Sequence, residues 1–118
     1  QKVEFMGFVE NTLSLLKSAD IYCMTSLAEG YGNTMIEAMS VGAKIICSKM
    51  KEGGPKDILA NNKFVTLFDP NNVDDLYKAL YKTLYFPRYS PHIINESKKY
   101  KSSLAAEKYL RELNNSKI

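Results

Sequence analysis

The residues best suited to chemistry lie in one stretch, residues 28–42, which reads AEGYGNTMIEAMSVG. It holds two carboxylates, Glu29 and Glu37, and two glycines that flank Tyr31. A carboxylate only accepts hydrogen bonds, so it suits neutral hydroxyl groups such as those of a sugar. Glycines let the backbone approach a ligand closely, as a loop around a phosphate group requires. The stretch therefore favours a ligand with both anionic oxygens and hydroxyl groups, and a nucleotide-sugar is such a ligand.

A loop, a helix and two strands are expected to position these residues. Gly30 and Gly32 form the loop, residues 33–40 favour a helix, and Gly42 stands where a helix C-cap belongs. The start of a helix presents free backbone N–H groups and the positive end of the helix dipole, which together attract anions. Apolar strands are expected on both sides, at residues 21–24 and 44–47.

The rest of the chain alternates strands with helices, which predicts an α/β fold with a parallel sheet flanked by helices. A strand is expected at 2–6, and Asn11 is a candidate N-cap for a short helix. A third strand is expected at 64–68, and Asn72 caps a long helix whose apolar face comprises Val73, Leu76, Tyr77, Leu80 and Leu84. Further helices are expected from Pro91 to about residue 100 and from Ser102 or Ser103 onward.

The bulk composition indicates one ordinary globular domain. Of the 118 residues, 45% are hydrophobic and 25% are charged. No apolar run approaches the ~18 residues of a membrane span, and no signal peptide is evident. Cys23 and Cys47 both lie in apolar strands and are expected to be reduced core thiols, which favours a cytoplasmic protein.

Several motifs in order resemble one enzyme family. The residues EGYG at 29–32, EAMS at 37–40 and then Gly42 resemble the E-x7-E motif of retaining GT-B glycosyltransferases of family 4, the glycosyl transferases group 1. The segment KEGGPKDIL at 51–59 is similar to the segment that follows in that family. The opening at 3–11 and Phe68-Asp69-Pro70 also match in order. The resemblance covers roughly residues 3–84, with a weaker match in the tail.

The resemblance implies a partial C-terminal nucleotide-sugar-binding domain over residues 1–118. Its core would span 2–86, its C-terminal helices 90–115, and its sheet would be Rossmann-like, as part of the C-terminal half of a GT-B fold. The active site of such enzymes lies between two domains, so this chain would require the N-terminal domain of the same protein, which usually supplies the acceptor groups. The full-length protein would be a retaining hexosyltransferase, and the fragment alone would be inactive.

The resemblance also implies roles for individual residues, each with a simpler alternative. Glu29, the candidate catalytic residue, would accept hydrogen bonds from the donor sugar, or it is a solvated loop acid. Glu37 would bind the ribose hydroxyls, or it is a helix-surface acid. The donor-binding residues would be Gly30, Tyr31, Gly32, Asn33, Thr34 and Glu37. The backbone N–H groups of 32–34 would meet the diphosphate, while the Thr34 hydroxyl either adds a bond or caps the helix.

Other residues of this stretch and the loop that follows it leave their roles open. Tyr31 either packs on the sugar or fills space. Lys51 and Lys56 either approach phosphate or are solvated. Met35, Ile36 and Met39 recur at helical spacing and are expected in the core.

The chain gives no reason to invoke a metal or another cofactor, because the nucleotide-sugar is itself a substrate. His92 is the single histidine and lies far from the motif, which disfavours a Ser-His-Asp triad or a histidine metal site. From Arg88 onward seven basic and three acidic residues give a net charge of +4. This basic tail either contacts a membrane surface peripherally or is the solvated face of surface helices, and no nucleic-acid partner is expected.

The expected reaction transfers a sugar from a nucleoside diphosphate sugar to a hydroxyl of an unknown sugar or lipid-linked acceptor. UDP is the nucleotide that the resemblance favours. Two alternatives remain open: a nucleotide-binding module without catalysis, and a nucleotide-sugar epimerase-type enzyme on a related fold. The second would need acid and base groups in the same cleft, and none is evident.

Overall fold

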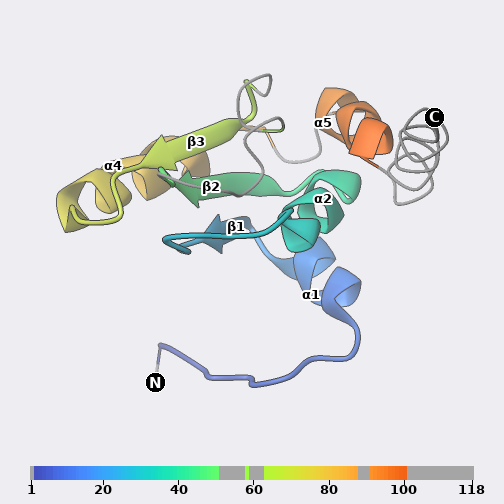
Figure 1. Ribbon diagram of the computed structural model, residues 1–118, viewed down its shortest axis with the longest axis horizontal. Helices are drawn as coiled ribbons and strands as arrows, with labels where there is room; N and C mark the ends of the chain where they lie inside the picture. The colour runs from blue at the N-terminus through green and yellow to red at the C-terminus, as the bar shows by residue number, and fades with distance from the viewer. Residues whose placement is uncertain (1, 51–57, 59–62, 88–90, 101–118) are drawn as a thin grey trace, which may run out of the picture.

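The structure is a computed structural model that describes residues 2–50, 58, 63–87 and 91–100. Its described part contains one parallel sheet of three strands in the order β1 (Ile21–Met24), β2 (Lys44–Ser48) and β3 (Val65–Phe68) (Figure 1). Ile21 lies beside Lys44, and Ile45 lies beside Val65. The predicted α/β fold with a parallel sheet flanked by helices is confirmed.

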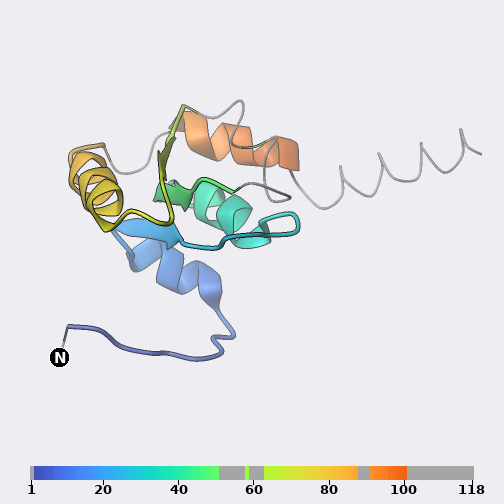
Figure 2. The same ribbon diagram turned by 60° about the vertical axis from the view of Figure 1, so that its left-hand side comes forward.

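Helices cover both faces of this sheet. On one face α2 (Asn33–Ser40) contacts β1 and β2, while α1 (Thr12–Ser18) and α5 (Pro91–Ser97) pack against α2. A short 3-10 helix, η1 (Lys98–Tyr100), follows α5 directly. On the other face α4 (Val73–Leu84) packs on β2 and β3, so that the strands lie between α4 and α2 (Figure 2).

The two faces of β2 illustrate why this strand is apolar throughout. Ile45 and Cys47 pack with residues of α2, whereas Ile46 packs with Ala79 of α4. Successive side chains of a strand point to opposite faces, and a parallel sheet is covered on both. The continuous apolar run Ile45–Cys47 is therefore what a central strand of this fold requires.

A glycine flanks the helix α2 at each end. Gly32 is its N-cap, with φ 78°. At the other end Gly42 has φ 69°, its N–H donates to the carbonyl of Met39 (3.0 Å), and the N–H of Ala43 donates to the carbonyl of Ala38 (3.0 Å). This pair of bonds is the Schellman motif, which requires a left-handed residue and so favours glycine. The prediction of Gly42 as the C-terminal stop of the helix is confirmed.

Asparagines cap α1 and α4, as the sequence predicts. Asn11 accepts a hydrogen bond from the N–H of Ser14 (3.1 Å), and Asn72 accepts one from the N–H of Asp75 (3.1 Å). Asp74 and Asp75 both lie in the first turn of α4, where negative charge is favoured by the helix dipole. Both caps confirm the sequence predictions.

The strand predicted at 2–6 is wrong. This segment contains no strand, and the side chains of Val3 and Phe5 are exposed, Phe5 to 91%. In Figure 1 it runs separately from the sheet before it reaches α1. A strand forms only where a neighbour pairs with its backbone, and among the described residues no strand lies beside this segment.

The face that α4 buries also differs from the predicted one. Ala79 and Thr83 are buried against the sheet and Leu76 and Leu80 are partly buried, while Val73, Tyr77 and Leu84 are exposed. Thr83 Oγ1 donates a hydrogen bond to Thr66 Oγ1 of β3 (3.0 Å). Small side chains let the helix approach the sheet closely, so this face packs in preference to the bulkier one.

The two cysteines are free, but their environments differ. Cys47 is buried, as predicted, whereas Cys23 is exposed, so its predicted place in the core is wrong. Cys23 lies opposite Ile46 in the sheet, on the face that α4 covers. Because α4 packs on β2 and β3, Cys23 at the edge in β1 stays open to solvent.

Some predictions lie outside the described residues. They are the segment at 51–59 that resembles the family, apart from Ile58, which is helical and buried, and the helix from Ser102 or Ser103 onward. In the described part of the chain, no helix is long and apolar enough to cross a membrane.

The left-handed conformation of Gly42 predicts a specific stability difference. Gly42→Ala should lower the free energy of unfolding by about 1–2 kcal/mol, because a Cβ is strained in that region. Gly30→Ala is the matched control: nothing lies within 4 Å of a Cβ there and its φ is not in that region, so the change should stay within about 0.5 kcal/mol. Urea denaturation measures both, and equal curves for the two variants would contradict the assignment.

Candidate functional site

The loop after β1 and the start of α2 lie at the carboxyl-terminal edge of the sheet. The three strands are parallel, so their arrowheads point to the same side in Figure 1, and the loop at 25–32 turns back there toward α2. In open α/β sheets, ligands bind outside the carboxyl ends of the strands. The predicted site residues of the loop and of the first turn of α2 are therefore placed where this fold binds ligands.

Hydrogen bonds connect Glu29 to the loop after β1 and, through that loop, to the end of β2. Its Oε1 accepts a hydrogen bond from Ser26 Oγ (2.6 Å), and its side chain is half-buried rather than solvated. The carbonyl of Ser26 in turn accepts a short hydrogen bond from Ser48 Oγ, at the end of β2. Ser48 is fully buried, so this contact fixes the loop after β1 to β2.

A tyrosine and a cysteine stay protonated beside Glu29. Burial raises the pKa of Tyr22 to about 12, with Cys47 and the Glu29 carboxylate adding to the rise, while a hydrogen bond with the Thr34 side chain opposes it. Burial likewise raises the pKa of Cys47 to about 11, with smaller contributions from Cys23 and Glu29. Both groups are neutral at physiological pH, so neither provides an anionic nucleophile.

The first turn of α2 presents its backbone amides without a side-chain cap. Gly32 at the N-cap has no side chain, and the carbonyl of Gly32 accepts from the N–H groups of Met35 (3.0 Å) and Ile36 (3.3 Å). The Thr34 side chain lies beside the Tyr22 phenol and lowers its pKa, against the larger effect of burial. The N–H groups of Asn33 and Thr34 lie at the start of the helix, where an anion is favoured.

Glu37 is anchored from the neighbouring helix. Its Oε2 accepts a hydrogen bond from Thr12 Oγ1 of α1 (3.0 Å), and the side chain is half-buried. Glu37 is thus a partly buried carboxylate with a hydrogen-bond partner in α1. On the inner side of the same helix Met35 and Met39 are fully buried and Ile36 is partly buried, as predicted.

Four residues that position the site were missed from sequence: Thr12, Tyr22, Ser26 and Ser48. Ser26 and Ser48 carry a usable signal, since each is a polar residue at or just after the end of a buried parallel strand. Thr12 carries none, because its contact with Glu37 spans 25 residues of sequence. Lys51 and Lys56 lie outside the described residues, and Tyr31 and Asn33 are exposed on the loop and the helix start.

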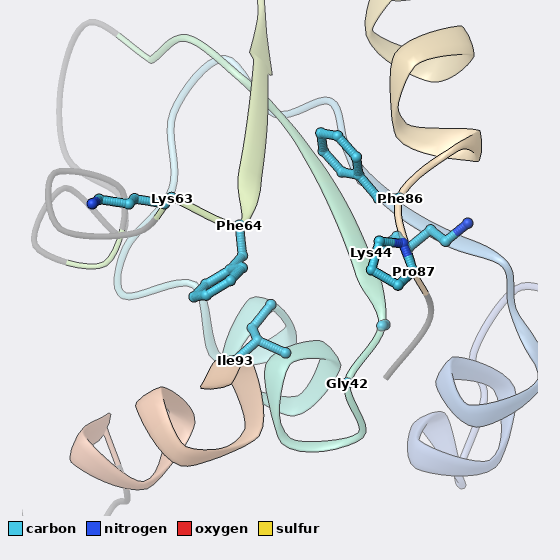
Figure 3. Close-up of a pocket in the computed structure, with 8 residues that line it drawn as sticks. Gly42, Lys44, Lys63, Phe64, Phe86, Pro87 and Ile93 are labelled. Carbon is cyan, nitrogen blue, oxygen red and sulfur yellow. The ribbon is translucent and has the colours of Figure 1, made fainter. Parts of the chain in front are cut away.

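Two cavities lie at opposite edges of the sheet. One, of about 400 Å³, is lined by residues after the ends of all three strands: Leu27, Lys49, Asp69, Pro70 and Asn71. The other, of about 240 Å³, is lined mostly by apolar residues from the opposite edge, among them Phe64, Phe86 and Ile93 (Figure 3). Lys44 and Lys63 direct their amino groups away from its centre in that view. Only the first of these two cavities shares the edge of the sheet with Glu29, and the lining residues given above do not include Glu29 or Glu37.

Comparison with known proteins identifies relatives of one functional class. An uncharacterised glycosyltransferase of Methanocaldococcus jannaschii is 32% identical over 100 residues, which is 83% of this chain and 25% of the relative. The MMP alpha-(1->4)-mannosyltransferase of Mycolicibacterium hassiacum is 33% identical over 79 residues, 67% of this chain and 19% of the relative.

A third relative acts on a lipid-linked substrate according to its name. It is the N-acetylgalactosamine-N,N'-diacetylbacillosaminyl-diphospho-undecaprenol 4-alpha-N-acetylgalactosaminyltransferase of Campylobacter jejuni, 23% identical over 80 residues, 68% of this chain and 22% of the relative. The chain thus spans about a quarter or less of the length of these relatives. No solved structure matches it.

The family model described as glycosyl transferases group 1 matches residues 1–100, which include the sheet, the glycine loop and both carboxylates. The chain therefore belongs to the glycosyl transferases group 1.

Proposed function

We propose that this chain is the donor-binding part of a retaining GT-B glycosyltransferase of family 4. The full-length protein would transfer a hexose from a nucleoside diphosphate sugar, with UDP as the nucleotide, to a hydroxyl of the acceptor. The observation that carries this proposal is the uncapped start of α2 at Gly32, with Glu29 before it and Glu37 after it. One face of this arrangement suits phosphate and the two carboxylates suit hydroxyl groups.

The diphosphate would lie against the first turn of α2. The backbone N–H groups of Gly32, Asn33 and Thr34 would donate to its oxygens, and the glycines at 30 and 32 permit the close approach. As the bond to the sugar breaks, negative charge grows on the diphosphate, and preoriented amides stabilise that charge. Lys49, which lines the cavity at the same edge of the sheet, is a cation that would add to this stabilisation.

Glu29 would hold the transferred sugar in position. Its carboxylate accepts from Ser26, but a carboxylate has about four acceptor sites, so capacity remains for the hydroxyls of the sugar. The contact chain from Ser48 through Ser26 fixes the carboxylate before the ligand arrives, which reduces the entropic cost of orienting the sugar. Tyr31, exposed on the same loop, would contact the donor.

Glu37 would accept hydrogen bonds from the ribose hydroxyls. It lies three residues after Thr34 on α2, so the two side chains share one side of the helix, one turn from the amides that would face the diphosphate. Thr12 of α1 holds one of its oxygens.

The acceptor would be a sugar or a lipid-linked saccharide, bound largely by the N-terminal domain of the same protein. The Campylobacter jejuni relative, named for a diphospho-undecaprenol substrate, supports the lipid-linked alternative. The reaction would occur in the cytoplasm and needs no metal, since amides and basic residues neutralise the leaving group. This chain alone would bind the donor weakly and would not transfer the sugar.

Glu29→Gln in the full-length protein should reduce transfer by about ten- to a thousandfold if the contact tightens in the transition state. The free energy of unfolding should change by less than about 0.5 kcal/mol, because glutamine can still accept from Ser26. UDP affinity should also change little, because UDP lacks the transferred sugar. Melting temperature, UDP binding and transfer rate form the set of measurements.

Ser26→Ala is the matched control for this prediction, because it keeps the carboxylate but removes its anchor. Its transfer rate should fall less than that of Glu29→Gln. A large drop in melting temperature with Glu29→Gln would make Glu29 a structural residue, and an unchanged transfer rate would remove it from the donor site.

Glu37→Ala should mainly weaken nucleotide binding. A charge-assisted hydrogen bond to a ribose hydroxyl contributes roughly 1.5–3 kcal/mol, or about ten- to a hundredfold in affinity for UDP. Isothermal titration with UDP measures this. Thr12→Val removes the contact between the helices but leaves the Glu37 carboxylate, so its effect should be smaller. Equal losses from both variants would assign Glu37 to helix packing rather than to the nucleotide.

A further inference from the structure

Three tyrosines follow one another on the outer side of α4 and its C-cap, here called the tyrosine stripe: Tyr77, Tyr81 and the C-cap residue Tyr85. Their exposed fractions are 66%, 54% and 73%. The ring centroids of Tyr77 and Tyr81 lie 6.3 Å apart, those of Tyr81 and Tyr85 lie 5.2 Å apart, and the Tyr85 hydroxyl donates to that of Tyr81 (3.1 Å). The spacing of four residues places them on one side of the helix. The stripe is thus an ordered aromatic surface that faces outward.

The inner face of α4 keeps the stripe in this orientation. Ala79 and Thr83 are buried against the sheet, and Thr83 hydrogen-bonds to Thr66 of β3. The helix therefore cannot rotate to bury the tyrosines without exposing its packed face. Val73 and Leu84, both exposed, add apolar area to the same side.

The stripe lies beside positive charge. Lys78 and Lys82 each follow a tyrosine of the stripe, and residues 76–87 contain no acidic residue. At the end of α4, Lys44 Nζ donates to the carbonyl of Leu84 (2.8 Å), which adds a third cation. The acidic residues of α4, Asp74 and Asp75, are confined to its first turn, where Asp75 accepts from the N–H of Asp69 (2.7 Å). An anionic partner complements this surface.

The composition favours a lipid surface over a second copy of the chain. Tyrosine combines an apolar ring with a polar hydroxyl and is enriched where membrane meets water. The three tyrosines of the stripe, with these exposed fractions, together offer on the order of 400 Å². A stable protein interface needs about 800 Å² from each partner. A small aromatic face with flanking lysines matches a peripheral membrane contact.

We propose that the tyrosine stripe of α4, with Lys78 and Lys82, binds the surface of an anionic phospholipid bilayer. The contact is peripheral: the tyrosines lie among the headgroups and the lysines meet the lipid phosphates. It is separate from the candidate donor site, which is formed at the edge of the sheet by the loop after β1 and by α2 on the opposite face. It does not depend on the transfer reaction.

The test is sedimentation of the full-length protein with vesicles, without donor or acceptor. One set of vesicles is phosphatidylcholine alone and the other contains phosphatidylglycerol. The protein should partition preferentially onto the anionic vesicles. Combined Tyr77→Ser, Tyr81→Ser and Tyr85→Ser should lower this partition at least tenfold. Lys78→Gln and Lys82→Gln should each lower it about fivefold, on the anionic vesicles only. Lys2→Gln with Lys98→Gln is the charge-matched control outside α4 and should bind as the unchanged protein does.

Three results would overturn the proposal. The first is equal partition onto the anionic vesicles of the unchanged protein and of the Lys78→Gln and Lys82→Gln variants. The second is a concentration-dependent dimer in analytical ultracentrifugation that the tyrosine substitutions dissociate, with no vesicle binding, which would make a second copy the partner. The third is a large loss of melting temperature in the tyrosine variant together with no effect of the lysine changes on vesicle binding, which would place the stripe against another part of the same protein. Because no sugar donor is present, failure of the proposed transferase activity would not alter any of these readings.

Discussion

The parallel pairing of β1 with β2 is the constraint on which the candidate site depends. Because both strands run in the same direction, the loop after β1 and the last residue of β2 meet at one edge, where Ser48 reaches the carbonyl of Ser26. That contact fixes the loop, and Ser26 then holds Glu29. An antiparallel arrangement of the same strands would place these residues at opposite edges, and neither contact would form.

The helix α2 links the core to the site. Met35, Ala38 and Met39 are fully buried, so the helix axis is fixed against the sheet and α5. Its first turn and Glu37 are then held where they can act, with Gly32 leaving the amides uncapped and Thr12 of α1 reaching Glu37. Close packing on one side of the helix thus provides the rigidity that a binding surface needs on the other.

The contrast between the two sides of α4 follows from side-chain size. Ala79 and Thr83 allow the helix to approach β2 and β3, and the larger tyrosines consequently lie outward. Sequence periodicity detects an apolar stripe on a helix. It does not show whether that stripe packs against the sheet or stays exposed. For α4 the helical period was correct and the chosen face was wrong in Val73, Tyr77 and Leu84.

What the sequence alone determined is what depends on local interactions. The bounds of β1 and α2, the caps at Asn11 and Asn72 and the left-handed Gly42 follow from residues only a few positions apart. The motif also located Glu29 and Glu37. Only the tertiary structure decided what holds these carboxylates, since Thr12 is 25 residues from Glu37 and Ser48 is 22 from Ser26. It also decided that 2–6 forms no strand, because a strand depends on which distant segment is its neighbour.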